Sequence, residues 1–153
     1  MNVLLVEDDE FKAKNLAEFV EDIFLESDID IAASLVQAID YVNKKKYDFL
    51  FVDMAIPSHP IVSGGGAPMS FLTGGLEVLL ELSSMDRDDA CFIVTQYPEI
   101  ELAGEFYPVD RAGKAIKEQL GYDVLGCVEF SEDTDYWKDQ IKMALKKNEY
   151  IDS

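Results

Sequence analysis

The chain has 153 residues, a length that favours one domain with its own hydrophobic core and no need for disulfides or a structural metal. Its 31 acidic and 13 basic residues give a formal net charge of −18, which repels phosphate backbones and anionic lipid headgroups. This charge argues against nucleic acid and membrane surfaces as partners.

The first part of the chain alternates strand patterns with helix patterns. An apolar run at residues 3–6 predicts a strand, and apolar side chains then recur at helical spacing from residue 11 to residue 24. Alternating apolar residues predict a second strand at 29–33. Ser34 is a suitable N-cap for a helix that runs from residue 35 to the lysines at 44–46. Such alternation is typical of βα units on a parallel sheet.

The middle of the chain holds two buried strands separated by a long irregular segment. The apolar run at residues 47–52 predicts the third strand, which ends at Asp53. Prolines and glycines between residues 57 and 75 predict an unusually long loop. A helix over residues 76–82 and a fourth strand over residues 91–95 follow.

The last part of the chain completes the alternation. Two prolines bracket residues 98–108, which show neither a helix nor a strand pattern. A helix over residues 111–120, a fifth strand over residues 124–130 and a helix that includes residues 137–145 follow. No repeat or linker divides the chain, so we expect one domain over residues 1–153.

Cysteine usage and the N-terminal segment bear on the compartment. Cys91 and Cys127 each lie in an apolar run, which favours buried thiols in a reducing compartment over a disulfide. The N-terminus lacks a basic segment followed by a long apolar one, and no window approaches about 18 uncharged apolar residues. We therefore expect a cytoplasmic protein.

Acidic residues follow two of the predicted strands. Glu7, Asp8 and Asp9 come directly after the first strand, and Asp53 ends the third. The carboxyl ends of parallel strands meet at one rim of the sheet, where open α/β sheets bind their ligands. Because converging carboxylates repel one another unless a cation lies among them, this rim is a candidate site for a divalent ion.

Four segments together resemble the receiver domain of two-component response regulators, and the resemblance extends over essentially the full chain. The segments that carry it are residues 3–9, 51–57, 75–79 and 92–95. The resemblance implies a three-layer α/β/α sandwich with a doubly wound, five-stranded parallel sheet in the order 2-1-3-4-5.

The resemblance also implies roles for individual residues. Asp53 would be the phosphoacceptor, and the hydroxyl of Thr95 would sense the phosphoryl group. A Mg²⁺ ion would be held by Asp8, by Asp53 and by the backbone carbonyl of Ala55, with Glu7 acting through water. The implied partners are a histidine kinase or phosphotransfer protein and a downstream protein.

The fifth strand departs from the family pattern. Receiver domains end this strand with a lysine whose ammonium pairs with the phosphoryl oxygens, whereas Glu129 or Phe130 occupies the corresponding place here. The loss of that cation removes charge compensation at the rim, and a glutamate adds repulsion. Lys114 and Lys117 in the preceding helix are the substitutes that we consider.

Two connections are longer than the family's usual ones, by about 14 and about 12 residues, and both exceed ordinary loop lengths. They lie at residues 58–73 and 96–110, and both are expected on the rim that carries Asp53. The first is either a lid or partner-binding loop, or a disordered surface loop.

Three functions remain open at this stage. The first is a stand-alone receiver that accepts a phosphoryl group on Asp53 in a phosphorelay and signals through protein–protein interaction, since no residues remain for an output domain. The second is a divergent receiver that binds its partner independently of phosphorylation, as the missing lysine suggests. The third is an aspartyl phosphatase of the haloacid dehalogenase type, but that chemistry needs a second aspartate where this chain has Ala55.

Overall fold

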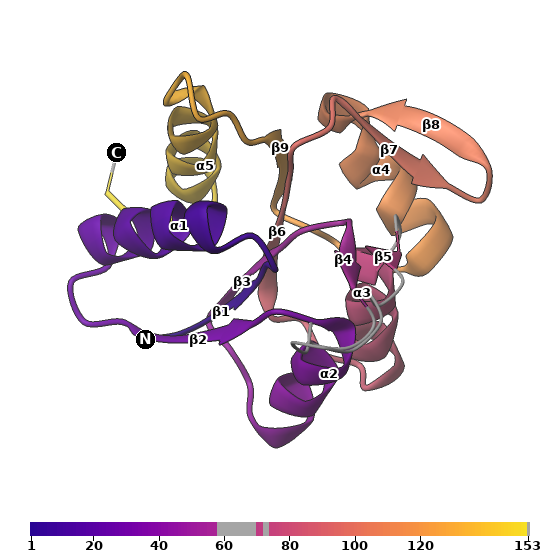
Figure 1. The fold of residues 1–153 in the computed structure, drawn as a ribbon, viewed down its shortest axis with the longest axis horizontal. Helices are drawn as coiled ribbons and strands as arrows, with labels where there is room; N and C mark the ends of the chain where they lie inside the picture. Colours follow the sequence, from indigo (N-terminus) through magenta and orange to yellow (C-terminus); the bar gives the residue numbers. More distant parts are fainter. Residues whose placement is uncertain (58–69, 72–73, 153) are drawn as a thin grey trace, which may run out of the picture.

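The computed structural model describes residues 1–57, 70–71 and 74–152. A five-stranded parallel sheet forms its centre (Figure 1). The strands of this sheet are β1 (Asn2–Val6), β2 (Asp28–Ala32), β3 (Phe49–Val52), β6 (Ala90–Thr95) and β9 (Gly126–Glu129). Their spatial order is β2-β1-β3-β6-β9, which confirms the predicted doubly wound order 2-1-3-4-5.

Helices cover both faces of the sheet. They are α1 (Glu10–Ile23), α2 (Leu35–Lys44), α3 (Gly74–Ser84), α4 (Val109–Leu120) and α5 (Tyr136–Lys147). Side chains of β1 alternate between two cores: Val3 and Leu5 pack with α1 and α5, whereas Leu4 and Val6 pack with α2, α3 and α4. Figure 1 shows α1 and α5 on one side of the sheet and the other three helices opposite.

Two short antiparallel pairs extend the predicted architecture. β4 (Ile56–Pro57) pairs with β5 (Ser70–Phe71), and the rest of the predicted loop 58–73 lies outside the described residues. β7 (Glu99–Leu102) and β8 (Glu105–Pro108) form a hairpin within the predicted loop 96–110. This hairpin fills the stretch for which the sequence showed no pattern.

Both cysteines of the chain are free thiols. Cys91 is buried, Cys127 is half-buried, and both are unpaired, as predicted. None of the helices in the described part of the chain has the length and hydropathy that a membrane span requires.

Candidate functional site

The backbone places the ends of β1 and β3 side by side. The N–H of Asp53 donates to the carbonyl of Val6 at 2.9 Å, and the N–H of Glu7 donates to the carbonyl of Ala32 at 2.9 Å. The parallel ladder therefore continues one residue past each strand. As a result, Glu7 and Asp53 lie next to each other at the carboxyl rim of the sheet.

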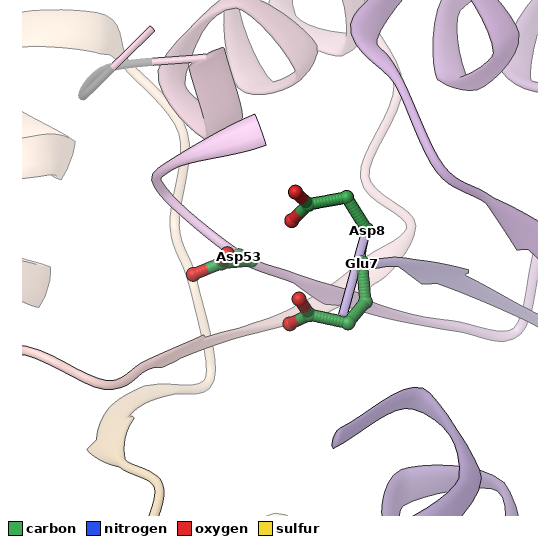
Figure 2. A group of neighbouring side chains, drawn as sticks. All are labelled: Glu7, Asp8 and Asp53. Carbon is green, nitrogen blue, oxygen red and sulfur yellow. The ribbon is translucent and has the colours of Figure 1, made fainter. Parts of the chain in front are cut away.

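The three predicted acidic residues come together. Glu7, Asp8 and Asp53 each offer a carboxylate oxygen, and these oxygens all lie within 4.8 Å of one another. Figure 2 shows that Glu7 and Asp8 project from adjacent positions and direct their carboxyl groups toward Asp53. Glu7 and Asp53 are buried, being 3% and 7% exposed, whereas Asp8 is exposed.

Close packing against α3 holds the segment that follows β3. The N–H of Gly75 donates to the carbonyl of Met54 at 3.0 Å. A Cβ atom at Gly75 would overlap the backbone carbonyl oxygen of Asp53. Glycine is therefore needed here because the first turn of α3 touches the backbone of Asp53 itself.

Asp9 does not join the acidic group. Its side chain accepts a hydrogen bond from the N–H of Lys12 at 3.1 Å, and it is the N-cap of α1. Three neighbouring acidic residues thus divide between two roles, since Glu7 and Asp8 face the rim and Asp9 starts a helix.

Lys12 is the residue of the site that the sequence interpretation missed. It lies in the first turn of α1, and its side chain is fully buried. Its ammonium nitrogen lies 2.6 Å from Glu7 Oε1 and 3.3 Å from Asp53 Oδ1, and it donates to the carbonyl of Val94 at 2.8 Å. A cation is therefore built into the acidic group.

A signal for Lys12 was present in the sequence. The buried face of α1 carries Leu16, Phe19 and Val20, and helical spacing places residue 12 on the same face. A lysine on the apolar face of a helix, directly after an acidic cluster, indicates a buried ion pair.

Burial raises the pKa of both buried carboxyl groups of the site. Burial raises the pKa of Glu7 to about 7, even though the Lys12 ammonium opposes this shift, and the nearby charge of Asp53 adds to it. Burial also raises the pKa of Asp53 above its ordinary value, again against the effect of Lys12. An additional cation at this site would lower both pKa values and favour the charged forms of the two carboxyl groups.

The donor set fits a hard divalent ion. All three groups offer carboxylate oxygens, the ligands that Mg²⁺ and Mn²⁺ prefer. Among the described residues no donor meets hydrogen-bond geometry at the buried Oε1 atom of Glu7, although Lys12 lies close to it. An incompletely satisfied buried oxygen beside two more carboxylates is consistent with a cation site.

The structure also locates the residues at the ends of β6 and β9. Thr95 is fully buried, and its hydroxyl oxygen accepts a hydrogen bond from the N–H of Tyr97 at 3.2 Å. Glu129 is exposed, whereas Phe130 is buried, with its ring centroid 5.8 Å from the ammonium of Lys12. The aromatic ring of Phe130, not the carboxylate of Glu129, therefore faces the site.

The substitutes proposed from the sequence do not reach Asp53. Lys114 is exposed on α4, and Lys117 lies 3.6 Å from Asp123. In the described part of the chain, Lys12 alone forms an ion pair with Asp53. The cation of this site thus comes from α1 and not from the helix that precedes β9.

Sequence comparison relates the chain to a response regulatory protein. No protein-family model matches the chain. The Detocs response regulatory protein DtcB of Vibrio alginolyticus is 31% identical over 147 residues, which cover 94% of this chain and 99% of that protein. The similarity therefore extends along nearly the whole of both sequences.

Solved structures share the fold. A CheY-like response regulator receiver domain protein from Methanospirillum hungatei JF-1 has a TM-score of 0.62 at 17% identity, with 97% of this chain and 96% of that one covered. The receiver domain of the sensor histidine kinase PA1611 from Pseudomonas aeruginosa PAO1 has a magnesium ion in its active-site cleft; its TM-score is 0.58 at 15% identity, with coverage of 95% and 94%. At these identities the likeness establishes the fold alone.

Proposed function

The chain belongs to the response regulator receiver domains of two-component signalling, and we propose that it accepts a phosphoryl group on Asp53 from a histidine kinase or phosphotransfer protein. The observation that carries this proposal is the convergence of Glu7, Asp8 and Asp53 within 4.8 Å at the carboxyl rim of the sheet. The aspartyl phosphatase alternative is set aside, because the chain belongs to the receiver family and has Ala55 where that chemistry needs a second aspartate.

The proposed transfer exchanges one bond to phosphorus for another. A carboxylate oxygen of Asp53 attacks the phosphorus of a phosphohistidine, an O–P bond forms, and the N–P bond breaks with its electron pair left on the imidazole nitrogen. The carboxylate is an anion approaching another anion, so the reaction needs positive charge nearby. Mg²⁺, when bound, would supply charge neutralisation and in-line orientation.

We assign the residues at the rim roles in metal binding and in sensing the phosphoryl group. Asp8 and Asp53 would hold the metal directly, together with the backbone carbonyl of Ala55, and Glu7 would act through water. Magnesium in the cleft of the PA1611 receiver domain supports the choice of ion. Thr95, which ends β6 and is buried at the same rim, would sense the phosphoryl group through its hydroxyl.

Intact-mass measurement tests the phosphoacceptor. After incubation with Mg²⁺ and a small acyl phosphate, the protein should gain the mass of one phosphoryl group, and hydroxylamine should remove it because an acyl phosphate is labile to that nucleophile. Asp53→Asn should gain nothing, whereas a variant of an exposed aspartate, Asp123→Asn, should be labelled like the wild type. Equal labelling of Asp53→Asn would assign the phosphoryl group to another residue.

The surface beside the site suits a protein partner. A cavity of about 290 Å³ lies between the rim and the β7–β8 hairpin, and its lining includes Met54, Thr95 and Ile100. Tyr97 and Phe106 border it and are more than half exposed, at 52% and 65%. Exposed aromatic side chains at a concave surface are common in protein interfaces, so we assign the downstream partner to this surface.

One observation favours a second function, a receiver that binds its partner without phosphorylation. β9 ends in Glu129, so the strand offers no cation that follows the phosphoryl group. A pull-down with an identified partner distinguishes the two functions. Binding that is unchanged in Asp53→Asn supports the second, and binding that requires phosphorylated Asp53 supports the first.

A further inference from the structure

We propose that Lys12 binds the phosphoryl group on Asp53 and thereby takes the place of the lysine that is absent from the end of β9. This inference rests on the proposed phosphorylation of Asp53 and names the residue that makes the phosphorylated state stable. Lys12 takes no part in bond formation, and its ammonium donates a hydrogen bond to a phosphoryl oxygen.

The contacts of Lys12 bring its ammonium to a carboxylate oxygen of Asp53. Its ammonium has one short contact to Glu7 Oε1 at 2.6 Å, one hydrogen bond to Val94 O at 2.8 Å, and a longer contact to Asp53 Oδ1 at 3.3 Å. A lysine ammonium has three donors, and these three oxygens are the partners within its reach. The longest of these contacts is the one made with the predicted phosphoacceptor.

Phosphorylation changes this contact in a defined way. Formation of the acyl phosphate removes the charge of the Asp53 carboxylate and places a dianionic phosphoryl group on one of its oxygens. The donor that was shared with Asp53 then has a stronger acceptor within reach, because charge-assisted hydrogen bonds to phosphoryl oxygens exceed those to a neutral carbonyl. Glu7 and Val94 keep the ammonium in position while its third N–H turns from Asp53 Oδ1 to a phosphoryl oxygen.

Burial makes this role specific to Lys12. Its side chain is 0% exposed, so its charge acts in a medium of low effective dielectric constant, where it is screened little by salt. A buried ammonium stays charged only when anionic or dipolar groups lie close to it. For Lys12 these groups are Glu7, Asp53 and the carbonyl of Val94. At the end of β9, the exposed Glu129 and the apolar Phe130 provide no competing cation.

The decisive experiment compares two affinities in one variant. In Lys12→Met, the affinity for BeF₃⁻ in the presence of Mg²⁺, measured by calorimetry, should fall roughly tenfold to a hundredfold through loss of one charge-assisted hydrogen bond. The affinity for Mg²⁺ alone should rise several-fold, since a positive charge has left the acidic group. Opposite changes support the proposal, whereas unchanged BeF₃⁻ affinity, or a parallel fall of both affinities, overturns it.

Two further variants control for structural damage. Lys12→Arg keeps the charge and should retain most of the BeF₃⁻ affinity, so a loss as large as that in Lys12→Met counts against the proposal. Lys14→Met removes an exposed lysine from the same helix and should leave both affinities unchanged. If it lowers BeF₃⁻ affinity as much as Lys12→Met does, the effect is one of general charge, and the proposal fails.

A structure of the wild-type protein with Mg²⁺ and BeF₃⁻ makes the test without any variant. Lys12 Nζ should lie within hydrogen-bond distance of a fluorine, and an ammonium bound only to Glu7 and Val94 would contradict the proposal.

The intact-mass experiment distinguishes failure of the proposed phosphorylation of Asp53 from failure of the proposed role of Lys12. A wild type that takes up no phosphoryl group overturns both, whereas normal uptake with undiminished BeF₃⁻ affinity in Lys12→Met overturns only the role of Lys12.

Discussion

Asp8 and Asp9 are adjacent in the sequence, yet their carboxyl groups have different environments. Asp8 contributes to the acidic group at the rim, whereas Asp9 accepts the hydrogen bond that begins α1. Their separate roles follow from the backbone, which turns between the end of β1 and the first residue of α1. A pair of matched substitutions therefore separates metal binding from helix capping.

Asp8→Asn should weaken Mg²⁺ binding by about tenfold or more, since affinity for a divalent ion depends on the number of charged oxygen ligands. Phosphorylation by a small acyl phosphate should slow in parallel. Asp9→Asn is the matched control: asparagine caps helices as well as aspartate does, so Mg²⁺ affinity and stability should both stay close to those of the wild type. Calorimetry that finds equal Mg²⁺ affinity in Asp8→Asn and the wild type would place the metal elsewhere.

At the scale of elements, the β7–β8 hairpin shows how an insertion is accommodated. Its two-residue connection consists of Ala103 and Gly104, with φ angles of 51° and 83°. Two positive φ values are typical of a type I′ turn, which matches the twist of antiparallel strands. Glycine adopts this conformation freely, but alanine does so at a cost of about 1–2 kcal/mol.

Ala103→Asn should stabilise the protein by about 1 kcal/mol, because asparagine tolerates the left-handed region and Asn-Gly is a favoured type I′ pair. Thermal unfolding should show a rise in Tm of about 2–4 °C. Ala103→Val is the contrasting variant and should lower Tm, since a β-branched residue is disfavoured at positive φ. A lower Tm in Ala103→Asn would contradict the turn assignment.

A second group of elements meets at Arg87 and Asp89, at the end of the sheet opposite the acidic site. Asp89 is buried and accepts hydrogen bonds from the N–H of Tyr47 at 2.8 Å and from Arg87 Nη2 at 2.6 Å. It therefore links the segments that precede β3 and β6. Arg87 in turn donates to backbone carbonyls of Val42 and Lys45 at the end of α2. The Arg87–Asp89 ion pair thus connects the amino ends of β3 and β6 to the carboxyl end of α2.

Asp89→Asn should lower the free energy of unfolding by about 1–3 kcal/mol at neutral pH, because it leaves a poorly exposed guanidinium without its charged partner. Burial by itself raises the pKa of Asp89, but the hydrogen bonds from Arg87 and Tyr47 outweigh it, and the net pKa lies below the ordinary value. Its contribution is therefore complete above the unfolded pKa of about 4 and is lost as the pH falls below it.

Denaturant unfolding of the wild type and Asp89→Asn between pH 3 and pH 7 checks this dependence, the range being roughly that of carboxyl titration. The difference in unfolding free energy should be constant above about pH 5 and should shrink below about pH 4. Asp88→Asn, which changes the exposed neighbouring aspartate, should show little difference at any pH. A difference that grows on acidification would contradict the lowered pKa of Asp89.

At the scale of the whole molecule, the position of the cation decides which element responds to phosphorylation. A ligand shifts a conformational equilibrium only through contacts that differ between the two states. In this chain the proposed differing contact is made by Lys12, which belongs to the first turn of α1 and is hydrogen-bonded to β6 through Val94. Among the residues that the structure describes, none makes a corresponding ion pair at the end of β9, so we expect the response to be concentrated near α1.

Hydrogen exchange with and without Mg²⁺ and BeF₃⁻ measures this response. Amide exchange should slow most at residues 7–14, which contain the acidic group and the start of α1, and residues 96–131 should change only modestly. Asp53→Asn is the control and should show no BeF₃⁻-dependent change. A response centred on residues 124–131 would indicate that β9 and not α1 transmits the signal.

The sequence by itself determined the order of the five sheet strands and five helices, the doubly wound sheet and the family resemblance. Periodicity and apolar runs are local patterns, and the chirality of βα units leaves few ways to arrange five such strands. It also placed Glu7, Asp8 and Asp53 at one rim, because each follows a parallel strand. Their chemical roles, with those of Thr95 and Ala55, stay predictions until the experiments above are done.

Only the tertiary structure decided which cation accompanies these carboxylates. Lys12 reaches the carbonyl of Val94, which is 82 residues away in the sequence, and no local pattern encodes such a contact. Helical spacing is enough to assign Lys12 to the buried face of α1, but the sequence interpretation missed it, and spacing does not reveal what that face contacts. The β7–β8 hairpin escaped prediction for a similar reason, since Ala103 adopts a conformation that its intrinsic preference opposes and that strand pairing stabilises.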